Sequence, residues 1–276
     1  FPYTTLFRSD GSEVEDETFP FNTGAGKKIW GSAAAADIDG DEKIDFVIGS
    51  SSQSLYVFDK TGLKSTYNSG KDIRGTPAIG NLDDDPELEI VFSSSSSNNK
   101  VFAINYDGSD VVGFPFDLNE KVFAGVALAK FDDNLKDDIV LVTDDGNIYL
   151  IFDNGSIAPG FPFSTDDKIR SAPLVVEIGS EKVIFSGSYD FNFYAINSDG
   201  SLRFKIPTGD EIQTSPSFLE HNGEKYIYFG SNDNKIYAVD DEGNALDGWP
   251  IEVNGSIVGS VVFSDLDGDG DPEIVA

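Results

Sequence analysis

Two short motifs recur along the chain with one period of 43 to 49 residues, and this repetition restricts the possible folds more than any other feature. The first motif is a β-branched residue followed, two positions later, by a run of small residues. It starts at Ile29, Ile73, Val122, Ile169, Ile212 and Ile257. The second motif alternates around an aromatic residue and ends in a turn, at Gly62, Gly108, Gly155, Gly200 and Gly243. Because both motifs keep one period, we expect one structural unit repeated along the chain.

Each repeat contains four short β-runs and no run of helical 3.6-residue periodicity. In the second repeat these runs are 76–80, 88–93, 100–105 and 113–118. Four strands within such a period are typical of one blade of a β-propeller. We therefore predict an all-β fold, a β-propeller of four-stranded blades with five complete blades and partial blades at both ends. The blades start near residues 29, 73, 122, 169, 212 and 257.

Residue types also differ between the predicted strands. The first strand of a blade carries small side chains, as in 33–36, which suit the crowded strand nearest the axis. The fourth strand carries proline, within 19–21, 113–116, 160–163 and 248–251. Because proline cannot donate a ladder hydrogen bond, it indicates an edge strand. We expect the aromatic residues beside these prolines to pack between blades, and we assign Trp30 and Trp249 to blade-packing positions.

This pattern resembles the FG-GAP/VCBS and PQQ-like families of β-propeller repeats, from Asp10 to the end of the chain. The resemblance implies a parent protein of six to eight blades. The first nine residues, FPYTTLFRS, match the translation of a common sequencing-adapter end, so we treat 1–9 as non-native. We accordingly expect 10–276 to be a single, incomplete propeller domain, a metagenomic fragment cut at both ends.

Acid-rich loops fall between the first and second predicted strands, and their odd positions carry oxygen. Side-chain oxygens occupy positions one, three, five and nine in three loops. These are Asp37, Asp39, Asp41 and Asp45 in the first blade, Asn81, Asp83, Asp85 and Glu89 in the second, and Asp265, Asp267, Asp269 and Glu273 in the last. Position seven offers a backbone carbonyl from Lys43, Glu87 or Asp271. Hard oxygen ligands at this spacing are what Ca²⁺ requires, so we predict Ca²⁺ at these loops.

The alternative is that Asp, Asn and Gly are simply good turn formers, but three loops in register favour calcium. The third blade has a weaker version of the loop, with Asp132, Asn134 and Asp138 as candidate ligands and Lys130 at position one. Whether it binds an ion stays open, and Lys130 itself could neutralise its acids. In the fourth and fifth blades the loop shortens to an ordinary hairpin that should bind none.

Composition excludes several classes of function. The formal net charge of −30 disfavours nucleic acids and anionic membrane surfaces as partners. No apolar run is long enough to insert into a membrane. The chain has no Cys and one His, His221, in a predicted turn, so thiol and His-rich metal catalysis are unavailable. Carboxylate pairs are too abundant to indicate glycoside hydrolysis.

We therefore predict a non-catalytic, calcium-stabilised binding or scaffold propeller of a secreted or cell-surface bacterial protein, with the periplasm as another possible location. Its ligand would be an extracellular protein or glycan, as in adhesion. The alternative is the propeller domain of an enzyme, either a quinone-dependent dehydrogenase or a polysaccharide-cleaving enzyme. The fold alone does not decide between them.

Overall fold

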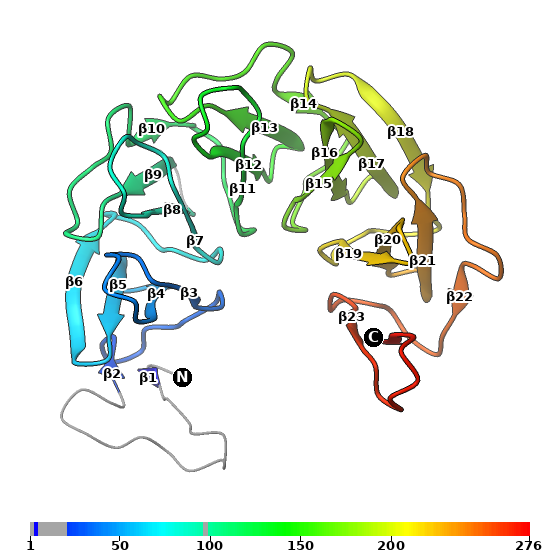
Figure 1. Cartoon of the computed structure of the whole chain (residues 1–276), viewed down its shortest axis with the longest axis horizontal. Coiled ribbons are helices and arrows are strands. Elements are labelled where there is room, and N and C mark those ends of the chain that lie inside the picture. Colours follow the sequence, from blue (N-terminus) through cyan, green and yellow to red (C-terminus); the bar gives the residue numbers. More distant parts are fainter. Residues whose placement is uncertain (1–2, 5–20, 96–98) are drawn as a thin grey trace. The chain divides into compact units, whose positions relative to one another are not determined.

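The computed structural model describes residues 3–4, 21–95 and 99–276 (Figure 1). These residues form two compact units. The first comprises the chain up to Ile139 together with Ile151–Ser156, and the second comprises Val140–Leu150 and Ile157–Ala276. The described residues contain no helix, and so none that is long and apolar enough to cross a membrane.

Five four-stranded antiparallel sheets follow one another along the chain, and in each of them neighbouring strands are consecutive in sequence. The first sheet contains β3 (Ala34–Ala36), β4 (Asp45–Ser50), β5 (Ser54–Asp59) and β6 (Gly62–Asn68). The second contains β7 (Ala78–Gly80), β8 (Glu89–Ser93), β9 (Lys100–Ile104) and β10 (Phe116–Asp117). The third contains β11 (Ala127–Ala129), β12 (Asp138–Val142), β13 (Asn147–Ile151) and β14 (Phe163–Ser164), and residues of both units contribute to it.

The fourth sheet contains β15 (Leu174–Ile178), β16 (Glu181–Gly187), β17 (Asn192–Asn197) and β18 (Leu202–Pro207). The fifth contains β19 (Ser217–His221), β20 (Glu224–Ser231), β21 (Lys235–Asp240) and β22 (Ile251–Glu252). Each sheet coincides with one sequence repeat. The predicted fold is confirmed: the protein is an all-β propeller built of four-stranded blades.

Two shorter sheets account for the predicted partial blades. β1 (Tyr3–Thr4) pairs with β2 (Phe21–Asn22), and β23 (Val262–Ser264) pairs with β24 (Glu273–Val275). The predicted outer strand at 19–23 is therefore β2, although Phe19 and Pro20 lie outside the described residues. Most of the predicted adapter segment also lies outside them, and its non-native origin stays a prediction.

Small residues of the first motif allow neighbouring blades to approach closely. A Cβ atom added to Gly31 would lie 2.8 Å from the carbonyl oxygen of Gly75, and one added to Gly75 would lie 2.1 Å from that of Ala124. The Ser32 N–H donates to the Thr76 hydroxyl across the same boundary. The small-residue segments that open successive blades of the first unit are therefore in backbone contact.

The hydrophobic core lies between neighbouring blades and is built from their second and third strands. In the first unit it joins β4 and β5 to β8 and β9, and in the second unit it joins β16 and β17 to β20 and β21. The buried members are Ile38, Val47, Leu55, Val57, Ile73, Ile90, Phe92, Phe102 and Ile104 in the first unit. In the second they are Val176, Val183, Phe185, Phe193, Ala195, Ile212, Ile227, Phe229 and Val239. This packing fixes the position of the loops at the strand ends.

The prolines and aromatic residues of the fourth strands follow the prediction in part. β10, β14 and β22 each begin directly after a proline that follows a cis peptide bond, so these prolines precede the edge strand instead of lying within it. Trp249 packs against a cluster that contains Tyr228 of its own blade and Val261, Phe263 and Ile274 of the following one, as a blade-packing residue should. The assignment of Trp30 is wrong, because 52% of its surface is exposed.

Candidate metal centres

The acid-rich loops connect the first strand of a blade to the second, as predicted. Residues 37–44 join β3 to β4, 81–88 join β7 to β8, 130–137 join β11 to β12, and 265–272 join β23 to β24. The ninth loop position is the first residue of the second strand in every case. The acids are therefore carried on short connections between two strands that are themselves hydrogen-bonded.

Two hydrogen bonds recur in all four loops. The carboxylate at position nine accepts from the backbone N–H of position two at 2.5 to 3.1 Å, in Asp45, Glu89, Asp138 and Glu273. The carboxylate at position three accepts from the backbone N–H of position five at 3.0 to 3.2 Å, in Asp39, Asp83, Asp132 and Asp267. These bonds use one side of each carboxylate for the loop backbone and turn the acids toward one another.

Carboxylate oxygens converge into one group of three in each loop, with the oxygens of a group within 4.8 Å of one another. The groups are Asp37, Asp39 and Asp41; Asp83, Asp85 and Glu89; Asp132, Asp138 and Asp153; and Asp265, Asp267 and Asp269. In the first and last loops these are positions one, three and five, while Asp45 and Glu273 at position nine are not in the group. The second loop brings together positions three, five and nine.

The remaining predicted ligands make other contacts. The Asn81 amide donates to the carbonyl of Asp85 at 3.3 Å. The ammonium of Lys43 forms an ion pair with Asp41 at 2.5 Å, so the first loop already holds one cation at its exposed edge. The side chain of Asp271 contacts His221, with Nε2 and Oδ1 2.9 Å apart. Coordination by the carbonyls of Lys43, Glu87 and Asp271 stays a prediction.

Glu89 is the ligand candidate that the structure singles out in the second loop. Its side chain is fully buried, Oε2 accepts the Leu82 N–H, and the buried Oε1 has no hydrogen-bond partner. Burial raises the pKa of Glu89 to about 7, against the opposing Leu82 N–H and with added repulsion from Asp83 and Asp85. A buried carboxylate that has one unpaired oxygen and belongs to a group with two other carboxylates fits a hard cation such as Ca²⁺.

The first loop has a similar feature. Oδ1 of Asp37 is buried and has no hydrogen-bond partner, while its Oδ2 accepts from the backbone N–H of Glu42 at 2.8 Å. Asp37 belongs to the group with Asp39 and Asp41. Two of the four loops therefore contain a buried acidic oxygen that nothing in the described part of the chain satisfies.

The third loop differs from its predicted form. Asp132 and Asp138 meet as expected, but their third partner is Asp153, which follows β13 and whose backbone N–H donates to Asp138. The Asn134 amide donates to Asp153 at 3.1 Å, and its role as a ligand stays a prediction. Burial raises the pKa of Asp138 to about 6, although the N–H groups of Phe131 and Asp153 oppose the shift. Asp153 was missed because it lies in the second sequence motif, outside the nine-residue loop.

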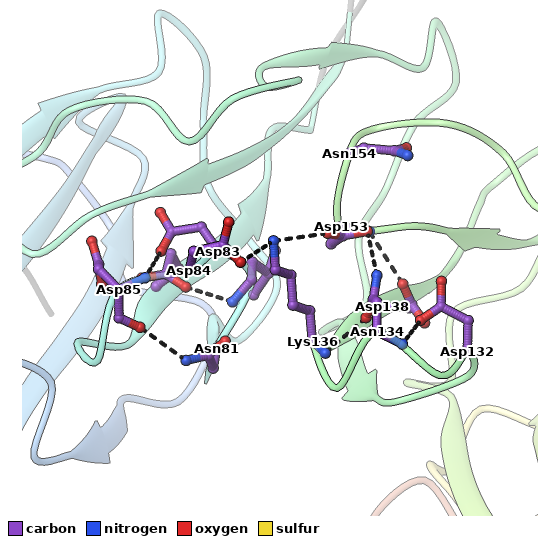
Figure 2. A network of polar contacts seen from close by, with 12 residues as sticks. Asn81, Asp83, Asp84, Asp85, Asp132, Asn134, Lys136, Asp138, Asp153 and Asn154 are labelled. Atoms are coloured by element: carbon purple, nitrogen blue, oxygen red, sulfur yellow. Dashed lines mark hydrogen bonds and ion pairs between the residues drawn. The ribbon is translucent and has the colours of Figure 1, made fainter.

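The lysine beside this acidic group is Lys136, which pairs with Asp153 of the group and with Asp84 of the second loop, whereas Lys130 lies exposed at position one. The Lys136 ammonium lies 2.9 Å from Asp84 and 3.7 Å from Asp153, between the second and third loops (Figure 2). The same two loops exchange hydrogen bonds between Asn81 and Asp137. The Leu88 N–H likewise donates to the carbonyl of Ile38, which links the second loop to the first.

The fourth and fifth blades carry tight hairpins in place of acid loops, as predicted. Ile178 pairs with Glu181, and His221 pairs with Glu224, which leaves two residues in each turn. Neither hairpin contributes to an acidic group among the described residues. The acid-rich loop is thus retained in four of the repeats and lost in two.

Comparisons with known proteins support the fold. No model of a known protein family matches the chain, and no curated protein matches it. Among solved structures, the chain is similar to BamB from Moraxella catarrhalis, with a TM-score of 0.63 and 18% identity over 91% of this chain and 73% of that one. It is also similar to BBS1N in a complex with ARL6DN, with a TM-score of 0.62 and 12% identity over 90% and 74% of the two chains. The computationally designed Ika8 protein gives a TM-score of 0.67 and 17% identity over 96% and 74%.

Proposed function

We propose that this propeller is a non-catalytic binding or scaffold domain whose blades are stabilised by Ca²⁺. The observation that carries the proposal is Glu89, a fully buried carboxylate with one unpaired oxygen among two further acids. A divalent cation would supply the positive charge that this oxygen lacks. Asp83, Asp85 and Glu89 would hold the ion in the second loop, with Asp37, Asp39 and Asp41 in the first and Asp265, Asp267 and Asp269 in the last.

We assign no ion to the third loop, because Lys136 and Asn134 both place donors beside Asp153, the third member of its acidic group. This assignment gives three calcium ions per chain. Loops of this kind, with ligands that are partly exposed, suit the millimolar calcium found outside cells. The proposed setting is accordingly a secreted or cell-surface bacterial protein with repeats of the FG-GAP/VCBS type.

The proposed role in binding rests on the architecture. BBS1N, which shares this fold, was solved in a complex with another protein, ARL6DN. A propeller presents many loops on a rigid core, and function on such a fold is carried by the surface of the loops. We propose a protein or glycan as the partner of this chain, with calcium acting on the scaffold and not on a reaction.

Thermal unfolding tests the calcium proposal. The melting temperature should rise in millimolar CaCl₂ relative to excess chelator, because ligand binding to the folded state alone stabilises it by mass action. MgCl₂ at the same concentration is the control for ionic strength, and it should raise the melting temperature less, since Mg²⁺ gives up its water reluctantly. Equal melting temperatures in calcium and in chelator would refute the proposal.

A further inference from the structure

A row of aromatic and basic side chains crosses three blades of the first unit. The guanidinium of Arg74 lies over the rings of both Trp30 and Phe123, 5.1 Å from each ring centroid. The ammonium of Lys28 lies over the ring of Trp30 at 4.8 Å. Lys28, Trp30, Arg74 and Phe123 are called here the cationic row. Such cation–π contacts hold a guanidinium in a fixed plane.

Three of the four residues of the cationic row occupy one position of the repeat. Trp30, Arg74 and Phe123 each follow the β-branched residue of the first motif, directly before the small-residue segment of their blade. They therefore precede β3, β7 and β11, whereas the acid-rich loops follow these strands. The row and the candidate metal sites lie at opposite ends of the same first strands, so the row is a separate surface.

Among the described residues, the cations of this row form no ion pair, in a chain where acids greatly outnumber bases. The sequence has 19 Lys and Arg against 49 Asp and Glu, yet neither Lys28 nor Arg74 forms an ion pair within the described residues. The buried Nε of Arg74 also lacks a hydrogen-bond partner there. Arg170, at the same repeat position in the fourth blade, instead binds Asp144 at 2.8 Å. Trp30 leaves half of its surface exposed beside these groups.

We propose that the cationic row is a docking site for an acidic peptide segment of a partner protein. The Arg74 guanidinium lies beside two rings, with each centroid 5.1 Å away, and a guanidinium binds a carboxylate in bidentate fashion through its planar N–H groups. Residues i and i+2 of an extended peptide lie on one side, about 7 Å apart. Lys28 and Arg74 lie 4.8 and 5.1 Å from the same indole centroid, so two acidic residues of such a peptide would pair with one cation each.

A peptide fits this row better than a sugar does. Lys28 and Arg74 both lie over the Trp30 ring, so the row presents two cations to a ligand, and a neutral sugar carries no charge that would pair with them. The chain as a whole repels anions, so affinity comes from contacts at the row and not from long-range attraction. Binding is therefore best measured near 0.15 M salt, where the screening length is about 8 Å.

Fluorescence anisotropy of the whole chain in calcium tests the docking site. The probe is a fluorescein-labelled peptide of alternating glutamate and glycine, compared with the same peptide bearing glutamine in place of glutamate. The glutamate peptide should bind and the glutamine peptide should not. Arg74→Gln should weaken binding about tenfold, since a charge-assisted hydrogen bond is lost. Trp30→Ala should weaken it about two- to fivefold by removing a cation–π contact.

Arg170→Gln is the matched control, because it removes an arginine from the same repeat position without touching the row, and it should leave binding unchanged. Calcium-dependent melting of each variant verifies that it is folded. Failure of the glutamate peptide to bind, equal affinity of the Arg74→Gln and Arg170→Gln variants, or tighter Arg74-dependent binding of oligogalacturonate would each overturn the inference. The docking inference rests on the proposed binding role. Calcium-dependent melting tests the calcium-stabilised scaffold separately from peptide binding, so either proposal can fail while the other holds.

Discussion

The carboxylate of Glu89 lies at the start of β8 with none of its surface exposed and with one oxygen unpaired. Without a cation this arrangement costs free energy, because an ionised carboxylate is held out of water beside two other acids. The cost is present above the raised pKa of about 7 and disappears as the pH falls and the group is protonated. A bound cation would convert the same residue from a destabilising into a stabilising one.

Glu89→Gln should therefore change stability in opposite directions with and without calcium. In chelator at pH 8 the variant should gain about 1 to 3 kcal/mol in unfolding free energy, because the buried charge is gone. Its amide oxygen can still accept the Leu82 N–H, and its NH₂ can donate to Asp83 or Asp85. In millimolar calcium it should be less stable than the wild type, since an anionic ligand is lost. Urea unfolding in both conditions measures the two differences.

Glu87→Gln is the control for this experiment. Glu87 is exposed in the same loop, and only its backbone carbonyl is a predicted ligand. The unfolding free energy of the Glu87→Gln variant should match that of the wild type both in chelator and in calcium. If Glu89→Gln destabilises the protein equally in calcium and in chelator, Glu89 is a structural hydrogen-bond acceptor and not a ligand.

At the level of strands and loops, neighbouring blades of the first unit touch through the segments that contain the first motif. Glycine in these segments allows the close contact. Gly75→Ala should lower the unfolding free energy by about 1 to 3 kcal/mol or more, because the added Cβ would overlap the Ala124 carbonyl oxygen at 2.1 Å. Calcium should not rescue this loss, since the contact lies at the other end of β7 from the acid-rich loop.

Gly259→Ala is the matched substitution, since Gly259 holds the same repeat position and an added Cβ there meets nothing within 4 Å. Gly259→Ala should leave the unfolding free energy unchanged or raise it by up to about 1 kcal/mol, because alanine reduces the conformational entropy of the unfolded chain. Urea unfolding of both variants in calcium provides the comparison. Equal effects of the two substitutions would show that the close approach at Gly75 is not what restricts this position.

The elements could be predicted from sequence because the signals that define them are local and repeated. The second predicted run, 88–93, becomes β8 at Glu89–Ser93, and the others of that blade agree to within a few residues. The contacts that the sequence analysis missed join residues of different motifs or of different repeats. Asp153 reaches the third acidic group from a different motif, and Lys136 reaches Asp84 in the neighbouring blade. The repeat position of Trp30 predicts a packing residue, yet half of its surface is exposed and Lys28 and Arg74 lie over its ring.

For the whole molecule, the net charge of −30 places a general cost on folding, because the acids are closer together in the folded chain than in the unfolded one. Repulsion is strongest in the candidate calcium loops, where several acids lie close together. Cations bound at these loops would reduce it. Loops of the first and second blades belong to the first compact unit, and the last loop belongs to the second. Calcium should therefore stabilise both units and not one alone.

Isothermal titration calorimetry of calcium into the chelator-treated protein tests this account most directly. It should give three ions per chain, one each for the loops that begin at Asp37, Asn81 and Asp265. Asp39→Ala and Asp267→Ala should each reduce the count to two, because each removes one carboxylate from a group of three. Absence of binding heat, or a count that neither substitution changes, would contradict the account.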